Sequence, residues 1–271
     1  MSRRDLPGAG EEKGDLGGSP CDAAIDEPAV RTALEVTLVP WASERGLEVP
    51  ESALAGLARY AALLLDENQR MNLTACRDAG ELVRRHLCDS LQFALALRRE
   101  GGWPSSLIDL GSGGGMPGLP LAILMEGCRV TLVESIRKKA SFLERAVGAL
   151  GLGTVEVVCG RAEELGRDRR RRGRFEACTA RACAALAVVC EYGLPLLARD
   201  GLLLTPKGPS APAEIEAAKK ALGLLGGDLG GVDGYRLPGA DVEFHMIRVV
   251  KKRPTPDTYP RAAAVIARRA L

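Results

Sequence analysis

Short apolar runs and helical stretches alternate regularly through the chain from residue 101 onward. The apolar runs read SLIDL, RVTLVES, TVEVVCG, FEACTAR and GLLLTPKG, and each is followed by a stretch whose apolar residues recur with helical spacing. Strand and helix in this order require right-handed crossovers, which make the strands parallel and place helices on both faces of the sheet. The sequence therefore predicts an α/β fold with a doubly wound, mostly parallel sheet.

The chain divides into four parts by composition. Residues 1–27 are rich in Gly, Pro, Asp and Glu with few large apolar groups, so we expect a disordered extension. Residues 28–100 show helical spacing and predict a helical cap in front of the α/β domain, 101–253. Within that domain, 242–250 alternate with a period of two and predict an antiparallel strand at a sheet edge or in a hairpin. Residues 254–271 form a basic tail.

Composition narrows the class of protein. With 271 residues, 46% of them hydrophobic and 27% charged, the chain can bury the core of one globular domain. No apolar run approaches the roughly 20 residues that cross a bilayer, and the first residues contain no apolar segment typical of a secretory signal. We therefore expect a cytoplasmic protein without a membrane partner. We also expect a monomer. Because the chain has two histidines and no cluster of Cys and His, we expect no metal site.

Positive charge is concentrated in two places, although the formal net charge is only +2. From Arg248 to the end, seven basic residues face one acidic residue, which is compatible with nucleic-acid binding and equally with a solvated terminus. A second run, GRDRRRRGR, contains Arg169–Arg172. It precedes the fourth predicted strand and so falls at the amino end of the sheet. We expect a solvated loop there rather than a clamp on phosphates.

The turn after the first predicted strand holds five glycines and two prolines within LIDLGSGGGMPGLPLAI, residues 107–123. Ligands of a doubly wound sheet bind at the carboxyl ends of the strands. Glycine allows a sharp turn there and lets a ligand lie against bare backbone. The stretch therefore predicts a ligand site at this turn.

Two ligands fit the spacing of these glycines. Read from Gly113, they match G-x-G-x-x-G, and Glu134 follows 21 residues later where an acid accepts from ribose hydroxyls, which is typical of a dinucleotide site. Read from Asp109, they match D-x-G-x-G-x-G. A carboxylate beside the turn repels a pyrophosphate but suits the ammonium group of S-adenosylmethionine. We favour S-adenosylmethionine and keep the dinucleotide as the alternative.

A series of motifs identifies a resemblance over about residues 50 to 262. The chain contains, in order, MNLTACRD, RRHLCDS, DLGSGGGMPGLPLAI, TLVESIRKKASFL, GRAEEL, ARA and KG. These resemble the glucose-inhibited division protein B family, bacterial enzymes that methylate N7 of a guanosine in small-subunit (16S) ribosomal RNA. The resemblance implies a Rossmann-like class I methyltransferase sheet of seven strands. It also implies S-adenosylmethionine as cofactor and 16S rRNA or the small ribosomal subunit as partner.

The resemblance also assigns site residues. The cofactor is expected at Gly111, Gly113 and Met116, at Glu134, Ser135 and Ile136, at Ala162 and Glu163, and at Arg181. Arg84, His86 and Lys207 match further family positions and are candidates for RNA contacts, although His86 is equally a half-buried structural histidine. Arg137 is a fourth candidate, because a positive charge at the start of a helix opposes the helix dipole and an RNA phosphate would explain it.

The expected chemistry needs few catalytic groups. Guanine N7 carries a free lone pair and loses no proton on methylation, so we expect no general base and assign no catalytic residue. The segment after the fourth predicted strand reads TARACAAL and lacks the D/N-P-P-Y/F/W motif of enzymes that methylate exocyclic amines. Two other functions remain as alternatives, an NAD(P)-dependent oxidoreductase and a non-catalytic ribosome-binding factor.

Overall fold

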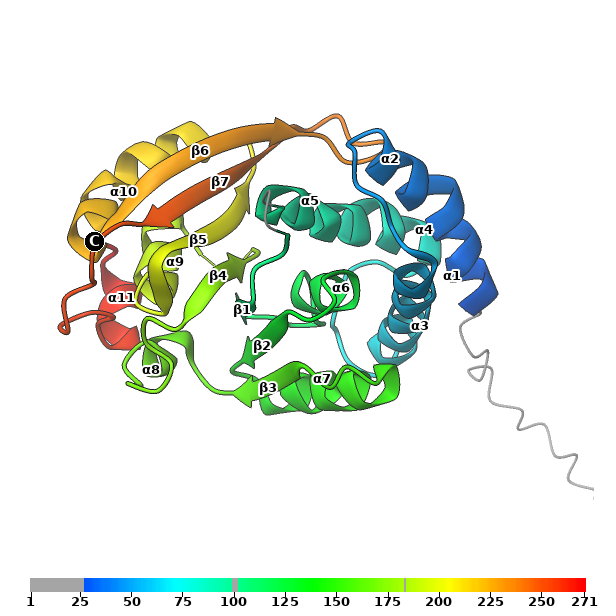
Figure 1. Cartoon of the computed structure of the whole chain (residues 1–271), viewed down its shortest axis with the longest axis horizontal. Helices are drawn as coiled ribbons and strands as arrows, with labels where there is room; N and C mark the ends of the chain where they lie inside the picture. Colours follow the sequence, from blue (N-terminus) through cyan, green and yellow to red (C-terminus); the bar gives the residue numbers. More distant parts are fainter. Residues whose placement is uncertain (1–26, 99–101, 183) are drawn as a thin grey trace, which may run out of the picture.

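Seven strands form one mixed sheet in the computed structural model, which describes residues 27–98, 102–182 and 184–271 (Figure 1). The expected disordered extension, apart from residue 27, lies outside the described residues. The strands are β1 Ser106–Leu110, β2 Arg129–Glu134, β3 Val155–Cys159, β4 Phe175–Ala180, β5 Leu197–Lys207, β6 Gly227–Tyr235 and β7 Phe244–Lys251. They lie in the order β3-β2-β1-β4-β5-β7-β6. The first five pair in parallel and β7 pairs antiparallel with β5 and β6, which confirms the predicted α/β fold.

Helices cover both faces of this sheet and bury a separate core on each. After the cap, the helices are α6 Gly118–Leu124, α7 Arg137–Leu150, α8 Ala162–Leu165, α9 Leu186–Gly193, α10 Ala211–Leu225 and α11 Ala263–Arg268. Successive residues of β1 point to opposite faces, so Leu107 joins the core under α6 and α7 while Ile108 joins the core under α9 and α10. No helix in the described ranges is long and apolar enough to cross a membrane.

The predicted cap is helical and packs on the same face as α6 and α7 (Figure 1). It consists of α1 Glu27–Ala33, the π-helical turn η1 Leu34–Leu38, α2 Val39–Ser43, α3 Glu51–Asn68, α4 Ala79–Leu82, the π-helical turn η2 Val83–Leu87 and α5 Cys88–Leu97. The apolar stripe of α3 is buried as its spacing predicts, with Leu57 and Leu64 fully enclosed. Each such leucine contributes roughly 1.5–3 kcal/mol of burial free energy. The cap thus shares a core with the sheet.

The predicted antiparallel strand is confirmed in one of its two expected positions, the hairpin. Strand β7 is antiparallel and belongs to a hairpin, but it lies between β5 and β6 rather than at the edge. The edge strand is β6, whose sequence GDLGGVDGY has four glycines and two aspartates and therefore low strand propensity. Pairing with β7 overrides that propensity. The register shifts between Leu229 and Gly231, as is common where glycine interrupts an edge strand.

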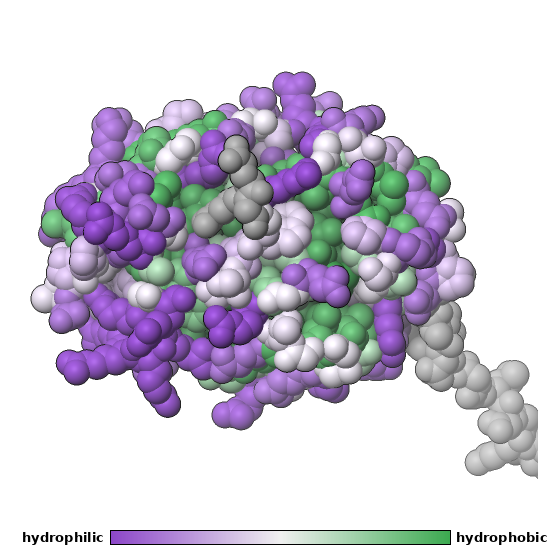
Figure 2. Space-filling view, in the orientation of Figure 1, coloured by the Kyte–Doolittle hydropathy of each residue, from purple (hydrophilic) through white to green (hydrophobic). Residues whose placement is uncertain are grey.

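The basic tail is packed against the molecule rather than free in solvent. Pro260 and Ile266 are buried, and Arg261 forms a 2.6 Å ion pair with Glu191 of α9, which is fully enclosed. Arg172 donates to the carbonyls of residues 255, 256 and 259. The tail and the arginine-rich loop therefore hold each other, and Figure 2 shows hydrophilic side chains gathered at the lower left, over α8 and α11.

Candidate functional site

The glycine turn after β1 bends over the end of β2. Gly111 and Gly113 have φ of +69° and +57°, a conformation that side chains other than glycine rarely adopt. The N–H groups of Gly111 and Ser112 donate to the carbonyl of Val133 at 2.9 and 3.0 Å. On the cap side, the hydroxyl of Tyr60 donates to the carbonyl of Gly114 at 2.7 Å. Hydrogen bonds to β2 on one side and to α3 on the other thus fix the backbone conformation of the turn.

Glu134 ties this turn to the end of β2. Its carboxylate accepts the N–H of Gly113 at 2.9 Å and the N–H of Ile136 at 2.7 Å, and the residue is only 6% exposed. A carboxylate oxygen accepts more than one hydrogen bond, so these two bonds leave acceptor capacity on both oxygens. The acid therefore stands at the expected place at the end of β2, held in one orientation by the backbone.

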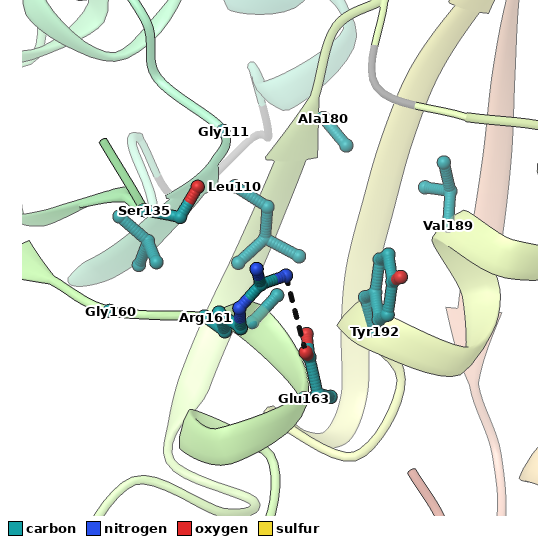
Figure 3. A pocket seen from close by; sticks show the side chains of 11 residues that line it. Leu110, Gly111, Ser135, Gly160, Arg161, Glu163, Ala180, Val189 and Tyr192 are labelled. Carbon is teal, nitrogen blue, oxygen red and sulfur yellow. Dashed lines mark ion pairs between the residues drawn. The ribbon is translucent and has the colours of Figure 1, made fainter. Parts of the chain in front are cut away.

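An open cavity of about 160 Å³ lies at the carboxyl ends of β1 to β4 (Figure 3). Its walls are Leu110, Gly111, Val133, Ser135, Gly160, Arg161, Ala162, Glu163, Ala180, Val189 and Tyr192. Figure 3 shows Val189 and Tyr192 of α9 on one side and Ser135 on the other. Arg161 and Glu163 form an ion pair of 3.9 Å at this cavity. Apolar walls, two bare glycines and nearby acids fit an adenosine, since they offer contact to a flat ring and acceptors to hydroxyls.

The structure brings together part of the predicted cofactor set. Gly111, Ser135, Ala162 and Glu163 border the cavity directly. Glu134 and Gly113 bond to each other beside it, and Ile136 follows Ser135 with 51% of its surface exposed. Met116, in contrast, is 5% exposed, belongs to the core under the cap and does not border the cavity.

Asp109 does not face this cavity, contrary to the argument that its carboxylate meets the ammonium group of the cofactor. The residue is fully enclosed, Oδ1 accepts the hydroxyl of Thr179 at 2.7 Å, and Oδ2 has no hydrogen-bond partner in the described part of the chain. Burial raises the pKa of this carboxyl above its ordinary value. The Asp109 side chain therefore links β1 to β4 inside the protein.

A second cavity, of about 290 Å³, lies beside the first. Its walls are Arg85, His86, Asp89, Arg181, Ala182, Pro206, Lys207, Gly208, Leu237 and Phe244. Ala180 borders the first cavity and Arg181 the second, so the two are neighbours at the end of β4. This second cavity brings cap residues and sheet residues into one site.

A chain of buried and half-buried polar groups connects the cap to the sheet at this cavity. Arg181 donates through Nη1 to Asp89 Oδ2 and to His86 Nδ1, each at 3.2 Å. Asp89 is 7% exposed and accepts the hydroxyl of Tyr235 through Oδ1 at 2.5 Å. The guanidinium is thus oriented by two acceptors on the cap, one of which is itself held by β6.

His86 is neutral in this arrangement. A guanidinium only donates, so Nδ1 of His86 accepts, and Nε2–H donates to Thr74 Oγ1 at 2.9 Å. Burial and the nearby charge of Arg181 lower the pKa of His86 to about 4. Both ring nitrogens are therefore occupied by protein partners, and the imidazole orients Arg181.

The other candidates for RNA contacts differ in accessibility. Lys207 borders the second cavity, but its Nζ pairs with Glu214 at 3.0 Å and donates to the carbonyl of Ala184 at 2.5 Å. Arg84 on η2 and Arg137 at the start of α7 are exposed. The two exposed arginines lie on elements that flank the carboxyl ends of the strands.

Sequence reasoning missed two tyrosines of the site. Tyr60 stands on the apolar stripe of α3, where a hydroxyl among leucines is a signal that a polar partner is required. Tyr235 ends β6, the strand that propensity did not reveal, so no local signal pointed to it.

The chain is similar to known proteins over most of its length. The family model GidB, described as rRNA small subunit methyltransferase G, matches residues 53–233. Ribosomal RNA small subunit methyltransferase G of Roseiflexus castenholzii is 45% identical over 230 residues, which cover 85% of this chain and 97% of the relative. The protein of the same name from Chloroflexus aggregans is 42% identical over 88% of this chain and 98% of its own length.

Solved structures support the fold at lower identity. An O-methyltransferase from Bacillus cereus in complex with SAH superposes with a TM-score of 0.54 at 16% identity, covering 82% of this chain and all of that one (100%). The [4+2]-cyclase SpnF superposes with a TM-score of 0.50 at 15% identity over 77% of this chain and 98% of its own. Fold alone does not choose between such activities. The family model and the sequence identity over most of the chain make that choice. The chain belongs to the rRNA small subunit methyltransferase G family.

Proposed function

We propose that this protein is an S-adenosylmethionine-dependent methyltransferase that methylates N7 of a guanosine in small-subunit (16S) ribosomal RNA. The observation that carries the proposal is the meeting of two cavities at the end of β4, one apolar and flanked by acids, the other bordered by arginine and lysine. A cofactor in the first and a base in the second would be neighbours. Family membership supports the same assignment.

The first cavity supplies what an S-adenosylmethionine site requires. Gly111 lets the ligand approach the backbone, and Glu134 offers acceptors for ribose hydroxyls. Ala162 and Glu163 close the end where an adenine would lie. Bound there, the cofactor provides an electrophilic methyl group on a cationic sulfur. The protein's own contribution is to hold that group at the boundary between the two cavities.

The second cavity suits the edge of guanine that is to be methylated. This edge presents two acceptors, N7 and O6. N7 must stay free for the methyl group, so a donor is needed at O6, and the guanidinium groups of Arg85 and Arg181 border the cavity. Phe244 and Pro206 add apolar surface for the base. Alignment of N7 with the methyl group and exclusion of water would then accelerate the transfer.

Proton transfer plays no part in this mechanism. N7 loses no proton, and the titratable groups of the second cavity are already engaged: His86 with Thr74 and Arg181, and Asp89 with Tyr235. These groups position Arg181. The reaction requires no general base, so we assign none.

Binding of the two candidate cofactors separates this function from its enzymatic alternative. Calorimetric titration should show binding of S-adenosylmethionine and none of NAD or NADP. Binding of a dinucleotide alone would favour the oxidoreductase. Binding of S-adenosylmethionine without methyl transfer to rRNA or small subunits would favour the non-catalytic factor.

Gly111→Arg tests the position of the cofactor. The arginine side chain would enter the first cavity, so S-adenosylmethionine binding should weaken by more than about a hundredfold, or 2.7 kcal/mol. Gly127→Arg is the matched control, because Gly127 also has a positive φ, +82°, and a Cβ there meets nothing within 4 Å. The assignment fails if Gly111→Arg binds S-adenosylmethionine as the wild type does.

Labelled methyl transfer identifies the substrate. Transfer to 16S rRNA in free form and in small subunits should be compared, followed by mapping of N7-methylguanosine. We expect the protein to act in the cytoplasm and to be a monomer. Size-exclusion chromatography with light scattering tests whether it is a monomer.

A further inference from the structure

A larger cavity, of about 740 Å³, lies where strands β1 to β4 begin, and we call it the amino-edge cavity. Its walls are Ser106, Arg129, Val130, Thr131, Gly153, Thr154, Val155, Glu156, Arg170, Arg171, Arg174 and Phe175. These residues come from the amino ends of β1 to β4, whereas the cofactor turn follows their carboxyl ends. Strand β1 has five residues, so the two sites are separated by about 17 Å along the sheet. This cavity therefore takes no part in methyl transfer itself.

The arginines of this cavity form a row across the amino ends of the strands. Arg129 begins β2 beside Ser106 of β1, and Arg174 immediately precedes β4 on the other side of β1. Two strand spacings separate β2 from β4, which amounts to about 10 Å. Arg171 reaches Glu156 of β3, at the far end of the sheet. A row of separated cations suits an extended polyanion better than a compact one.

The charges of the row are only partly neutralised. Arg171 pairs with Glu156 at 2.6 Å and Arg170 with Asp168 at 3.1 Å. Arg129 and Arg174 form no ion pair within the part of the chain that the structure describes. Glu176, the second residue of β4, accepts the N–H and the hydroxyl of Ser105.

The arginine-rich loop is held in place by the tail, although Arg169 and Arg170 are exposed as expected. Arg172 donates to backbone carbonyls at 255, 256 and 259, and Arg167 donates to the carbonyl of Pro260 at 2.8 Å. The tail thus anchors both ends of the arginine run. Arginines presented on an anchored loop lose less conformational entropy on binding than those on a mobile one.

We propose that this amino-edge cavity binds the phosphate backbone of a second stretch of the rRNA substrate, away from the target guanosine. The inference rests on the proposed function, which supplies the RNA. The planar guanidinium matches phosphate oxygens with two parallel hydrogen bonds, and Thr154, which is exposed, adds a hydroxyl donor. The site increases affinity for long RNA without reading its sequence.

The double variant Arg129→Gln/Arg174→Gln tests this site. Two lost phosphate contacts should reduce the slope of log K against log salt by about 1.4 to 1.8 and raise the Kd for 16S rRNA on the order of tenfold at physiological salt. Fluorescence anisotropy over a salt series measures both quantities. Lys219→Gln/Lys220→Gln on exposed positions of α10 is the matched control, because it removes the same charge elsewhere.

Failure of this inference is distinguishable from failure of the proposed function. If the wild type neither binds S-adenosylmethionine nor methylates rRNA, the proposed function is wrong. If the wild type does both and the arginine variant keeps its affinity and salt slope, the amino-edge site is wrong. Equal losses in the arginine and lysine variants would also overturn it, since they would indicate a general effect of charge.

Discussion

The neutral state of His86 ties the stability of the site to pH. In the folded protein its pKa is about 4, below the ordinary value of 6.5, because burial and Arg181 disfavour the charged ring. The folded state therefore binds fewer protons than the unfolded chain between these values. The stability that the neutral ring contributes is present above pH 6.5 and is lost as the pH falls toward 4.

This linkage predicts a specific loss of stability. Between pH 7 and 5 the free energy of unfolding should fall by about 2 kcal/mol because of His86. His86→Gln removes the titration and keeps an acceptor for Arg181 and a donor for Thr74. Urea unfolding at pH 5, 6 and 7 measures the effect, and the same pH dependence in wild type and variant would contradict it.

At individual positions, sequence reasoning located the glycine turn after β1 better than the contacts of the residues around it. The glycines and Glu134 stand where their spacing indicates, because the turn that follows a parallel strand is a local feature. The environments of Asp109 and Met116 were not predictable from spacing, since tertiary packing encloses both. The pairing of Arg181 with Asp89 joins residues 92 positions apart, and no local pattern shows such a contact.

Among the elements, α3 supports the glycine turn after β1 through a hydroxyl group. Tyr60 is fully buried and donates to the carbonyl of Gly114. Burial keeps the pKa of this phenol well above its ordinary value, so it remains a donor. The cap therefore supports the glycine turn that borders the proposed cofactor site, and it also borders the second cavity.

Tyr60→Phe should weaken both stability and cofactor binding. It leaves the buried carbonyl of Gly114 without its partner, which costs about 1–3 kcal/mol. Urea unfolding measures that loss, and calorimetry should show severalfold weaker binding of S-adenosylmethionine because the turn loses its support. Tyr259→Phe removes a hydroxyl in the C-terminal segment and serves as control. Unchanged cofactor affinity in Tyr60→Phe would show that the turn holds its shape without α3.

Elements with strong local periodicity were predictable and those made by pairing were not. The five parallel strands and the stripe of α3 appear where apolar periodicity places them. Strand β6 was missed because its glycines and aspartates disfavour strand, and only its pairing with β7 makes it one. Because β6 was not recognised, the sequence left open whether β7 lies at an edge or in a hairpin.

At the scale of the whole molecule, the proposed boundary between cap and α/β domain crosses a continuous core. Leu57 and Leu91 of the cap share one cluster with Val130 and Leu132 of β2. A cap without the sheet, or this face of the sheet without the cap, would expose these side chains to water. The division at residues 100 and 101 therefore separates segments of the sequence rather than folding units.

We therefore predict that the cap and the α/β domain unfold together. The two tryptophans report on each part separately, because Trp41 is 6% exposed in α2 of the cap and Trp103 lies three residues before β1. In the single-tryptophan variants Trp103→Phe and Trp41→Phe, urea unfolding followed by fluorescence should give the same midpoint as far-UV circular dichroism of the same variant. A fluorescence midpoint of the Trp41 probe distinct from the circular dichroism midpoint would mean that the cap unfolds alone. The second cavity would then also open alone, since Asp89 and His86 on the cap hold Arg181.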